Sequence, residues 1–122
     1  MQPIPALILV STTSDQLATL ELIAQELLDQ RLAACVQISG PVTSHYRWEG
    51  SLTRSSEYLL TAKSRADLWP AIQAAIRSRH HYELPEIIAL PADASEDYYW
   101  WVLRETDAGT PSLSNQDDSN NQ

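Results

Sequence analysis

The sequence predicts an α+β domain of the ferredoxin-like class, a β-α-β-β-α-β antiparallel sheet with helices on one face plus a short C-terminal helix. Two observations support this class. Runs typical of strands and of amphipathic helices alternate in that order, and right-handed crossovers place both helices on the same face. The 122 residues suffice for one domain, expected over residues 1–106. Residues 107–122 are a polar tail without periodicity, which predicts disorder.

The first strand and the first helix follow from a change in apolar spacing. Residues 6–11 form a continuous aliphatic run, as expected of a central strand covered on both faces. Thr13 and Gln16 have the spacing of a capping box, with Thr13 as N-cap. Apolar residues at helical spacing then continue to about Gln30, so this segment is predicted to be an amphipathic helix.

The next two strands are predicted to form a hairpin that is too long for the domain. Residues 34–46 read as a strand, and the Gly40-Pro41 pair within it predicts a bulge or an edge position. Residues 48–51 supply the turn, and residues 52–63 return as the third strand. A strand of about thirteen residues at ~3.3 Å each reaches roughly 40 Å, whereas a small domain is about 30 Å across. Because an unpaired overhang is a liability that self-association removes, the sequence predicts an oligomer.

The second half of the domain reads as a helix, a strand and a last short helix. Asp67 is the predicted cap of the helix over residues 68–79, because Pro70 then falls in the first turn, where no backbone N–H is missed. Residues 87–90 form the fourth strand. Residues 97–105 form the final helix, which is rich in aromatic side chains.

Composition excludes several classes of function. The net charge is −8 and Lys63 is the only lysine, so the chain lacks the basic face that nucleic acids or anionic membranes would attract. No apolar run is long enough to span a bilayer, and no basic residue precedes the first run as a signal peptide requires. The single Cys35 rules out an intramolecular disulfide and fits a reducing compartment. We therefore expect a cytoplasmic protein.

A dense polar cluster, His-His-Tyr-Glu-Leu-Pro-Glu, occupies residues 80–86. Pro85 disfavours helix at the residue before it, so the cluster lies at a helix-to-strand junction, where binding residues usually lie. Two imidazoles with a carboxylate from Glu83 or Glu86 favour Cu(II), Zn(II) or Ni(II) over calcium. The alternative is that His80, in its charged form, caps the negative end of the preceding helix.

Five short motifs also occur in a fixed order along residues 6–104. They are Arg-Leu-Ala-Ala-Cys-Val at 31–36, Ser-His-Tyr-Arg-Trp-Glu-Gly at 44–50, Glu57 with Lys63, the 80–86 cluster, and Tyr98 with Trp101. In this order and spacing they resemble the CutA divalent-cation tolerance family. The resemblance implies a small ferredoxin-like homotrimer that is associated with metal binding and with tolerance of copper and other divalent ions.

The chain departs from the family pattern at three positions. His81 stands where the family usually has proline, and Arg79 occupies the first position of the histidine pair seen in some members. Ser11 stands where some members carry a cysteine proposed as a copper ligand, and a hydroxyl is a poor ligand for copper(I). That copper site is therefore not implied here, while His80 remains at the family position.

The resemblance and the residue types together name three sets of candidate residues. The candidate metal ligands are His80, His81, Cys35 and Glu86. The candidate inter-subunit cleft or ligand residues are Lys63, Glu57, Tyr82 and Trp48. The candidate interface residues are Tyr46, Tyr98 and Trp101.

Each set has a structural alternative. Cys35 could pack in the core rather than ligate a metal. Lys63 and Glu57 could form a structural or cross-subunit ion pair rather than an anion site. Tyr82 and Glu86 could simply orient the junction, and the aromatic residues could be core anchors.

The leading expectation is a homotrimeric, divalent-metal-binding protein linked to copper tolerance. Its partners would be copies of itself and a Cu or Zn ion that folding does not require, with no nucleic acid and no membrane. The alternative is a small-molecule-sensing signalling trimer that binds an anionic metabolite between subunits through Lys63 and Arg79. We expect no enzyme, because the sequence contains no evident nucleophile–base pair and no glycine-rich phosphate loop.

Overall fold

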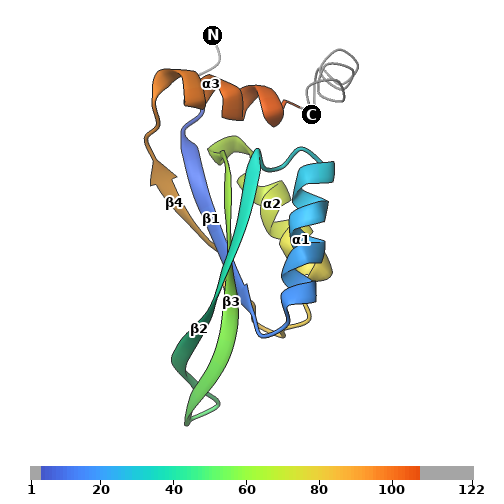
Figure 1. The fold of residues 1–122 in the computed structure, drawn as a ribbon, viewed down its shortest axis with the longest axis vertical. Helices are drawn as coiled ribbons and strands as arrows, with labels where there is room; N and C mark the ends of the chain where they lie inside the picture. Colours follow the sequence, from blue (N-terminus) through green and yellow to red (C-terminus); the bar gives the residue numbers. More distant parts are fainter. Residues whose placement is uncertain (1–3, 108–122) are drawn as a thin grey trace.

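The computed structural model describes residues 4–107, which contain a four-stranded antiparallel sheet in the order β2-β3-β1-β4 (Figure 1). Along the chain the elements are β1 (Leu7–Ser14), α1 (Leu17–Asp29), β2 (Cys35–Trp48), β3 (Ser51–Arg65), the 3₁₀ helix η1 (Ala66–Leu68), α2 (Trp69–Arg79), β4 (Ile88–Ala92) and α3 (Glu96–Glu105). The predicted ferredoxin-like order and the additional C-terminal helix are confirmed. The predicted tail over 107–122 lies, apart from Asp107, outside the described residues.

Helices α1 and α2 cover one face of the sheet (Figure 1), as the crossover rule predicts. Alternate residues of β1 and β3 point to this face and pack with the helices in the core. The core cluster consists of Ile8, Val10, Leu20, Ile23, Leu27, Leu32, Ala33, Leu60, Ala62, Ile72, Ala75 and Ile76. Burial of these side chains holds the ends of β1 and α2 together, and the candidate site lies at those ends.

The opposite face of the sheet lies away from α1 and α2. Because strand side chains alternate, Leu9 of β1 and its partners Lys63 and Leu90 project on this side. Edge strand β4 leaves Ile88 47% exposed and Leu90 59% exposed. This face therefore presents apolar side chains to solvent in a single chain.

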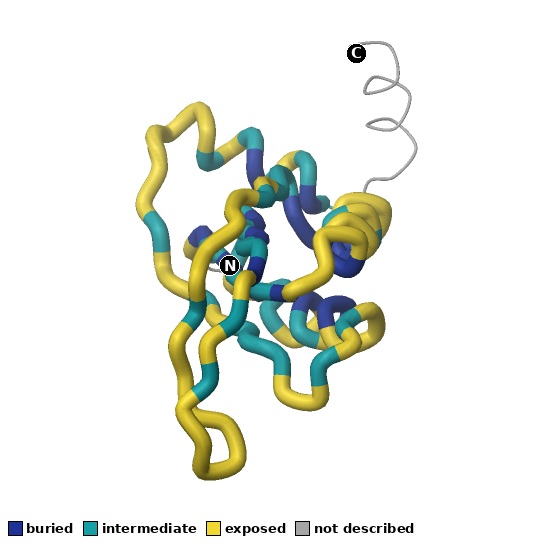
Figure 2. Tube along the Cα trace, turned by 60° about the horizontal axis from the view of Figure 1, so that its bottom comes forward, coloured by how far each residue is buried: buried dark blue, intermediate teal, exposed yellow. Residues whose placement is uncertain are grey.

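The β2–β3 hairpin extends past the sheet, as its length predicts. Residues 51–57 of β3 pair only with β2, because β1 ends opposite Tyr58. Figures 1 and 2 show the hairpin projecting beyond the helices, with an exposed tip. Glu49 (φ 50°) and Gly50 (φ 84°) form a two-residue turn of the kind that matches strand twist. A register shift between Ser39 and Val42 places the predicted bulge at Gly40-Pro41 of an edge strand.

The first helix begins later than the capping box predicts. Strand β1 continues to Ser14, and α1 begins at Leu17 with Gln16 as an N-cap that makes no side-chain cap bond. Thr13 is paired with Leu59 in the β1–β3 ladder, so its extended backbone belongs to the sheet. Instead, the Ser14 hydroxyl accepts the Gln16 amide over 3.0 Å.

The predicted cap of the second helix is also wrong. Asp67 lies within η1, and α2 begins at Trp69 with Pro70 in its first turn. The Asp67 carboxylate is bound by two guanidinium nitrogens of Arg65, at 2.8 and 2.9 Å, which explains why it does not cap the helix.

No helix within residues 4–107 combines the length and apolar character needed to cross a membrane.

Candidate functional site

The ring of His80 is held between two backbone groups at the end of α2. Its Nε2 lies 2.7 Å from the Thr13 carbonyl oxygen, so Nε2 carries the proton and donates. Its Nδ1 then accepts the Tyr82 amide over 3.1 Å. Burial lowers the pKa of His80 below the ordinary 6.5, although the hydrogen bond to Thr13 opposes this change. His80 is therefore a neutral imidazole that ties α2 to β1, and both of its nitrogens are already used.

The neighbouring His81 makes an exposed contact with a carboxylate. Its Nε2 lies 3.1 Å from Asp15 Oδ1, and its Nδ1 lies 3.1 Å from Thr19 Oγ1. The side chains of His81 and Asp15 are 37% and 51% exposed, so solvent and ions reach both. The spatial series of the Thr19 hydroxyl, the His81 imidazole and the Asp15 carboxylate resembles a hydrolase triad. Thr19, however, is only 7% exposed on α1, so its hydroxyl is not presented to a substrate.

Tyr82 links the junction to a buried carboxylate on β3. Its hydroxyl donates to Glu57 Oε2 over 2.6 Å and accepts the Asp15 amide over 2.8 Å. Burial and then the hydrogen bond to Glu57 raise the pKa of Tyr82 well above 10.0. The His80, His81 and Tyr82 rings lie 4.7 to 5.6 Å apart by centroid. Three residues from different elements thus fix this aromatic group: Thr13 from β1, Asp15 from the turn after β1, and Glu57 from β3.

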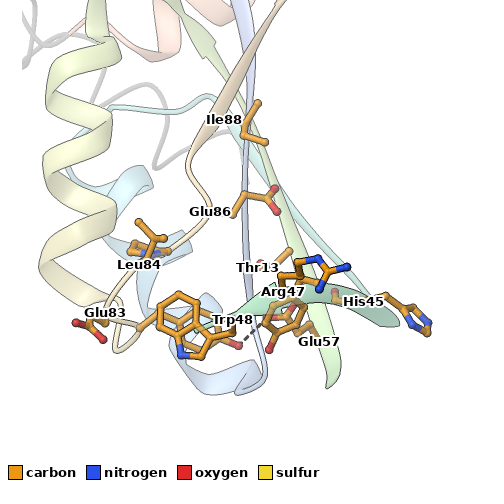
Figure 3. Close-up of a pocket in the computed structure, with 13 residues that line it drawn as sticks. Thr13, His45, Arg47, Trp48, Glu57, Glu83, Leu84, Glu86 and Ile88 are labelled. Atoms are coloured by element: carbon orange, nitrogen blue, oxygen red, sulfur yellow. Dashed lines mark hydrogen bonds between the residues drawn. The ribbon is translucent and has the colours of Figure 1, made fainter. Parts of the chain in front are cut away.

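A pocket of about 800 Å³ opens between the projecting hairpin and the segment that leads into β4. Its lining residues are Thr13, Ser44, His45, Tyr46, Arg47, Trp48, Glu57, Tyr82, Glu83, Leu84, Pro85, Glu86 and Ile88. Figure 3 shows His45 at its outer end and Glu86 and Ile88 towards β4. Glu86 Oε2 accepts the Ser11 hydroxyl over 3.0 Å. The lining is net negative, because it contains three carboxylates (Glu57, Glu83 and Glu86) and one guanidinium (Arg47).

Cys35 and Lys63 lie away from the junction. They are paired across β2 and β3, in the same row as Leu9, whereas His80 contacts Thr13 at the other end of β1. Cys35 is a half-buried free thiol. The structure therefore does not bring Cys35 together with His80, His81 or Glu86.

Lys63 and Glu57 do not pair within one chain. They are six residues apart in β3, which corresponds to about 20 Å. The Lys63 ammonium instead lies 5.9 Å from the ring centroid of Tyr98, which contacts Trp101 at 5.3 Å. Arg79, the other cation of the anion-binding alternative, binds Glu26 of α1 at 2.9 Å. The two cations thus contact different elements and do not form one anion site in a single chain.

Two of the three predicted interface residues, Tyr46 and Tyr98, are exposed, and so is the predicted cleft residue Trp48. Tyr46, Trp48 and Tyr98 are among the exposed large hydrophobic residues, and Trp101 is half-buried. Tyr46 and Trp48 lie on the projecting hairpin, whereas Tyr98 lies on α3 at the opposite end of the sheet. All three are available to a partner.

Within residues 4–107 no group of three or more His, Cys, Asp or Glu side chains is arranged to hold a metal ion. The exposed imidazole–carboxylate pair is His81 with Asp15. Sequence reasoning missed Asp15, because its segment reads as a helix cap. Its position directly after a central strand was the available signal, since strand ends meet junction loops.

Comparison with known proteins gives one consistent family. The family model described as "CutA1 divalent ion tolerance protein" matches residues 8–105. The divalent-cation tolerance protein CutA of Thermus thermophilus is 36% identical over 100 residues, covering 81% of this chain and 95% of that protein. Human protein CutA is 38% identical over 93 residues, covering 75% of this chain. The chain spans about half the length of the human and mouse relatives, at 52% and 49%.

Solved structures agree with these sequence matches. CutA from Xylella fastidiosa superimposes with a TM-score of 0.80 at 32% identity, covering 84% of this chain and 99% of that one. CutA1 from Shewanella sp. SIB1 also gives 0.80 at 32% identity, with 85% and 98% covered. The predicted fold and the predicted family resemblance are both confirmed.

Proposed function

This chain belongs to the CutA1 divalent ion tolerance family, and we propose that it is a homotrimer that binds a divalent transition-metal ion, Cu(II) or Zn(II). Family membership supports a role in tolerance of divalent cations, and the tolerance proteins named among its relatives support the same role. The site geometry supports a specific pair of ligands. The exposed apolar surfaces support self-association.

The contact between His81 and Asp15 carries the proposal. In tetrahedral geometry, Zn–N distances of about 2.0–2.1 Å and Zn–O distances of about 2.0–2.2 Å leave the two ligand atoms roughly 3.3–3.5 Å apart. The observed separation of Nε2 and Oδ1 is 3.1 Å, so one ion fits both atoms with little movement. Both side chains are exposed, so an ion can reach them.

Thr19 supplies the support that a ligating histidine needs. A metal-bound imidazole normally donates its other N–H to a fixed acceptor, which sets its tautomer and orientation. With Nε2 on the metal, His81 Nδ1–H would donate to the buried Thr19 hydroxyl oxygen at 3.1 Å. That hydroxyl in turn donates to the side-chain amide oxygen Oε1 of Gln16 over 3.5 Å. The imidazole is therefore preorganised from the helix side.

In this proposal His80 is the neighbour that fixes the junction, and His81 is the first ligand. Ligation by His80 would require its bond to the Tyr82 amide or to the Thr13 carbonyl to break. The sequence prediction of a site through His80 and Glu86 stays testable by the same experiment. Because ligation needs neutral imidazole, metal affinity should fall in acid.

Two protein ligands leave coordination positions open, and a second copy of the chain or water would fill them. Self-association is supported by the hairpin overhang, in which β3 pairs with β2 and not with β1, and by exposed Ile88, Leu90 and Leu52. Multi-angle light scattering should give three times the 13.7 kDa chain mass. A monomeric or dimeric mass at micromolar concentration would reject the trimer.

The ligand assignment is tested by calorimetric titration of Zn(II) and Cu(II) into the purified protein. His81→Ala and Asp15→Asn should each weaken binding at least tenfold. His45→Ala is the matched control, because this histidine lies on the hairpin and lines the pocket, whereas His81 and Asp15 do not line it. Unchanged affinity in His81→Ala would overturn the assignment, and loss of affinity in His80→Gln alone would return the site to His80.

We also propose that the protein binds its metal ion without catalysing a reaction, and that it is located in the cytoplasm. The burial of Thr19 supports a non-catalytic role for the hydroxyl beside His81. A single free cysteine supports a reducing compartment. Cell fractionation with antibody against the full chain tests the location, and recovery in a membrane-enclosed organelle or the periplasm would reject it.

A further inference from the structure

The proposed ligands His81 and Asp15 come from two separate connections of the chain. Asp15 lies between β1 and α1, and His81 lies between α2 and β4. Their side chains are 37% exposed for His81 and 51% exposed for Asp15, so packing alone does not fix either one. A pair of exposed ligands binds an ion tightly only where other contacts hold both in place. The contacts around the pair therefore show which residue positions it.

Tyr82 contacts both ligand residues. Its hydroxyl oxygen accepts the backbone amide of Asp15 over 2.8 Å, although the two residues are 67 positions apart. Its ring lies edge-on to the His81 imidazole, with 4.7 Å between the centroids and an interplanar angle of 78°. Aromatic rings prefer this arrangement. One side chain thus holds the backbone of one ligand and the ring of the other.

The contact with the Asp15 backbone matters because aspartate has a short side chain. Only its first two side-chain torsions separate the backbone from the carboxylate, so the backbone position decides where the oxygen can reach. Oδ1 of this residue lies 3.1 Å from His81 Nε2 while its amide is bound to Tyr82. The next amide, of Gln16, is bound to the Ser14 hydroxyl over 3.0 Å. Both amides of this turn are held, and Tyr82 holds the one that belongs to the ligand.

Tyr82 is itself fixed by the sheet. Its hydroxyl donates to Oε2 of Glu57 over 2.6 Å, and Glu57 on β3 is 6% exposed. Its backbone amide donates to His80 Nδ1 over 3.1 Å. All of these contacts form within one chain, so they do not depend on what covers the hairpin or the pocket in an oligomer. Tyr82 therefore links the position of the buried sheet to the two exposed ligands.

From these contacts we infer that Tyr82 is a positioning residue for the metal ion, an inference that rests on the proposed function. Its hydroxyl sets the distance from the Asp15 carboxylate to the His81 imidazole without contacting the ion. Loss of an outer partner of this kind lowers metal affinity by about 10–100-fold. If Tyr82 only stabilised the fold, a folded variant without the hydroxyl would bind metal as the wild-type protein does.

Calorimetric titration of Zn(II) into the full-length protein measures the affinity of each variant, after circular dichroism has shown that the variant is folded. Tyr82→Phe keeps the ring and removes the hydroxyl, and it should weaken binding by about tenfold or more. Tyr99→Phe is the matched control, because the Tyr99 hydroxyl also donates over 2.6 Å, to the Pro5 carbonyl, on α3 at the other end of the sheet (Figure 1). The control should keep wild-type affinity. Equal affinities in the two variants would overturn the inference.

A double-mutant cycle tests whether Tyr82 acts through Asp15. In an Asp15→Ala background no carboxylate remains to be positioned, so Tyr82→Phe should lower affinity there by less than about twofold. The full loss in that background would contradict the inference, because the hydroxyl would then act independently of Asp15.

The electron paramagnetic resonance spectrum of Cu(II), added at one equivalent, supplies a readout that fold stability does not change. The spectrum of Tyr82→Phe should differ from that of the wild-type protein and approach that of Asp15→Ala, because both variants lose the carboxylate ligand. Identical spectra for Tyr82→Phe and the wild-type protein would reject the positioning role.

The failure of this inference is distinguishable from the failure of the proposed function. Unchanged affinity in His81→Ala would reject the ligand pair itself, and the role of Tyr82 with it. Lost affinity in His81→Ala together with wild-type affinity in Tyr82→Phe would reject the role of Tyr82 alone.

Discussion

Replacing Tyr82 by phenylalanine removes one hydroxyl that makes two hydrogen bonds at the junction. That hydroxyl donates to Glu57 over 2.6 Å and accepts the Asp15 amide over 2.8 Å. A hydrogen bond to a charged group contributes about 1.5–3 kcal/mol, and a neutral one contributes about 1 kcal/mol. Glu57 is buried, so little water reaches it to replace the lost donor. We expect Tyr82→Phe to lower the free energy of unfolding by about 2–4 kcal/mol at pH 7.

The same hydroxyl predicts a dependence on alkaline pH. The folded state raises the pKa of Tyr82 above its ordinary 10.0, mainly through burial and the bond to Glu57. The unfolded chain therefore loses this proton first, and the contribution of Tyr82 to stability is complete below pH 10 and declines above it. Phenylalanine has no such proton. The stability difference between the two proteins should therefore shrink as pH rises above 10.

Urea unfolding followed by tryptophan fluorescence measures both effects, at equal chain concentration because assembly adds to apparent stability. Tyr46→Phe is the matched control, since the Tyr46 hydroxyl makes one long, exposed contact of 3.3 Å to Ser55. The control should lose less than about 0.5 kcal/mol. Equal, small losses in both variants would mean that solvent replaces the Tyr82 bond, and the account of Glu57 as a buried carboxylate would fail.

Three further predictions concern the fold around the site. Because burial lowers the pKa of His80 below 6.5, its contribution to stability is present above 6.5 and is lost as pH falls below that value. His80→Gln should flatten this acid dependence in pH-dependent unfolding, whereas a charged helix cap would give greater wild-type stability at low pH. Thr12→Val should stabilise the protein by about 1 kcal/mol in urea unfolding, because the fully buried Thr12 hydroxyl lacks a partner within residues 4–107; a loss of stability would reveal a partner. Gly40→Ala should lower the melting temperature more than Gly50→Ala, because a Cβ at Gly40 would lie 3.1 Å from a backbone oxygen whereas the space at Gly50 is open; equal losses would contradict this geometry.

The order of elements was predictable because it depends on local signals. Apolar periodicity separates strands from helices, and a two-residue turn at Glu49-Gly50 closes the hairpin at the place where the sequence indicates it. The boundary at Thr13 was not predictable in this way. Its local capping pattern competes with a ladder partner, Leu59, that lies 46 residues further along the chain, and the ladder prevails.

The candidate site was only partly predictable. The 80–86 cluster drew attention to His81, Tyr82 and Glu86, and all three lie at the junction or in the adjacent pocket. Their partners come from distant parts of the chain, since His81 and Asp15 are 66 residues apart and Tyr82 and Glu57 are 25 apart. These contacts depend on where β1 ends relative to α2, which only the packed structure defines.

The most direct test of the proposed metal site is anomalous diffraction at the zinc edge, from crystals of the full chain grown with Zn(II). The account predicts an anomalous peak about 2.0–2.2 Å from both His81 Nε2 and Asp15 Oδ1. The Nδ1 of the same ring should keep its contact with the Thr19 hydroxyl. A peak on His80, a peak confined to the Glu57 pocket, or no peak at His81 would contradict it.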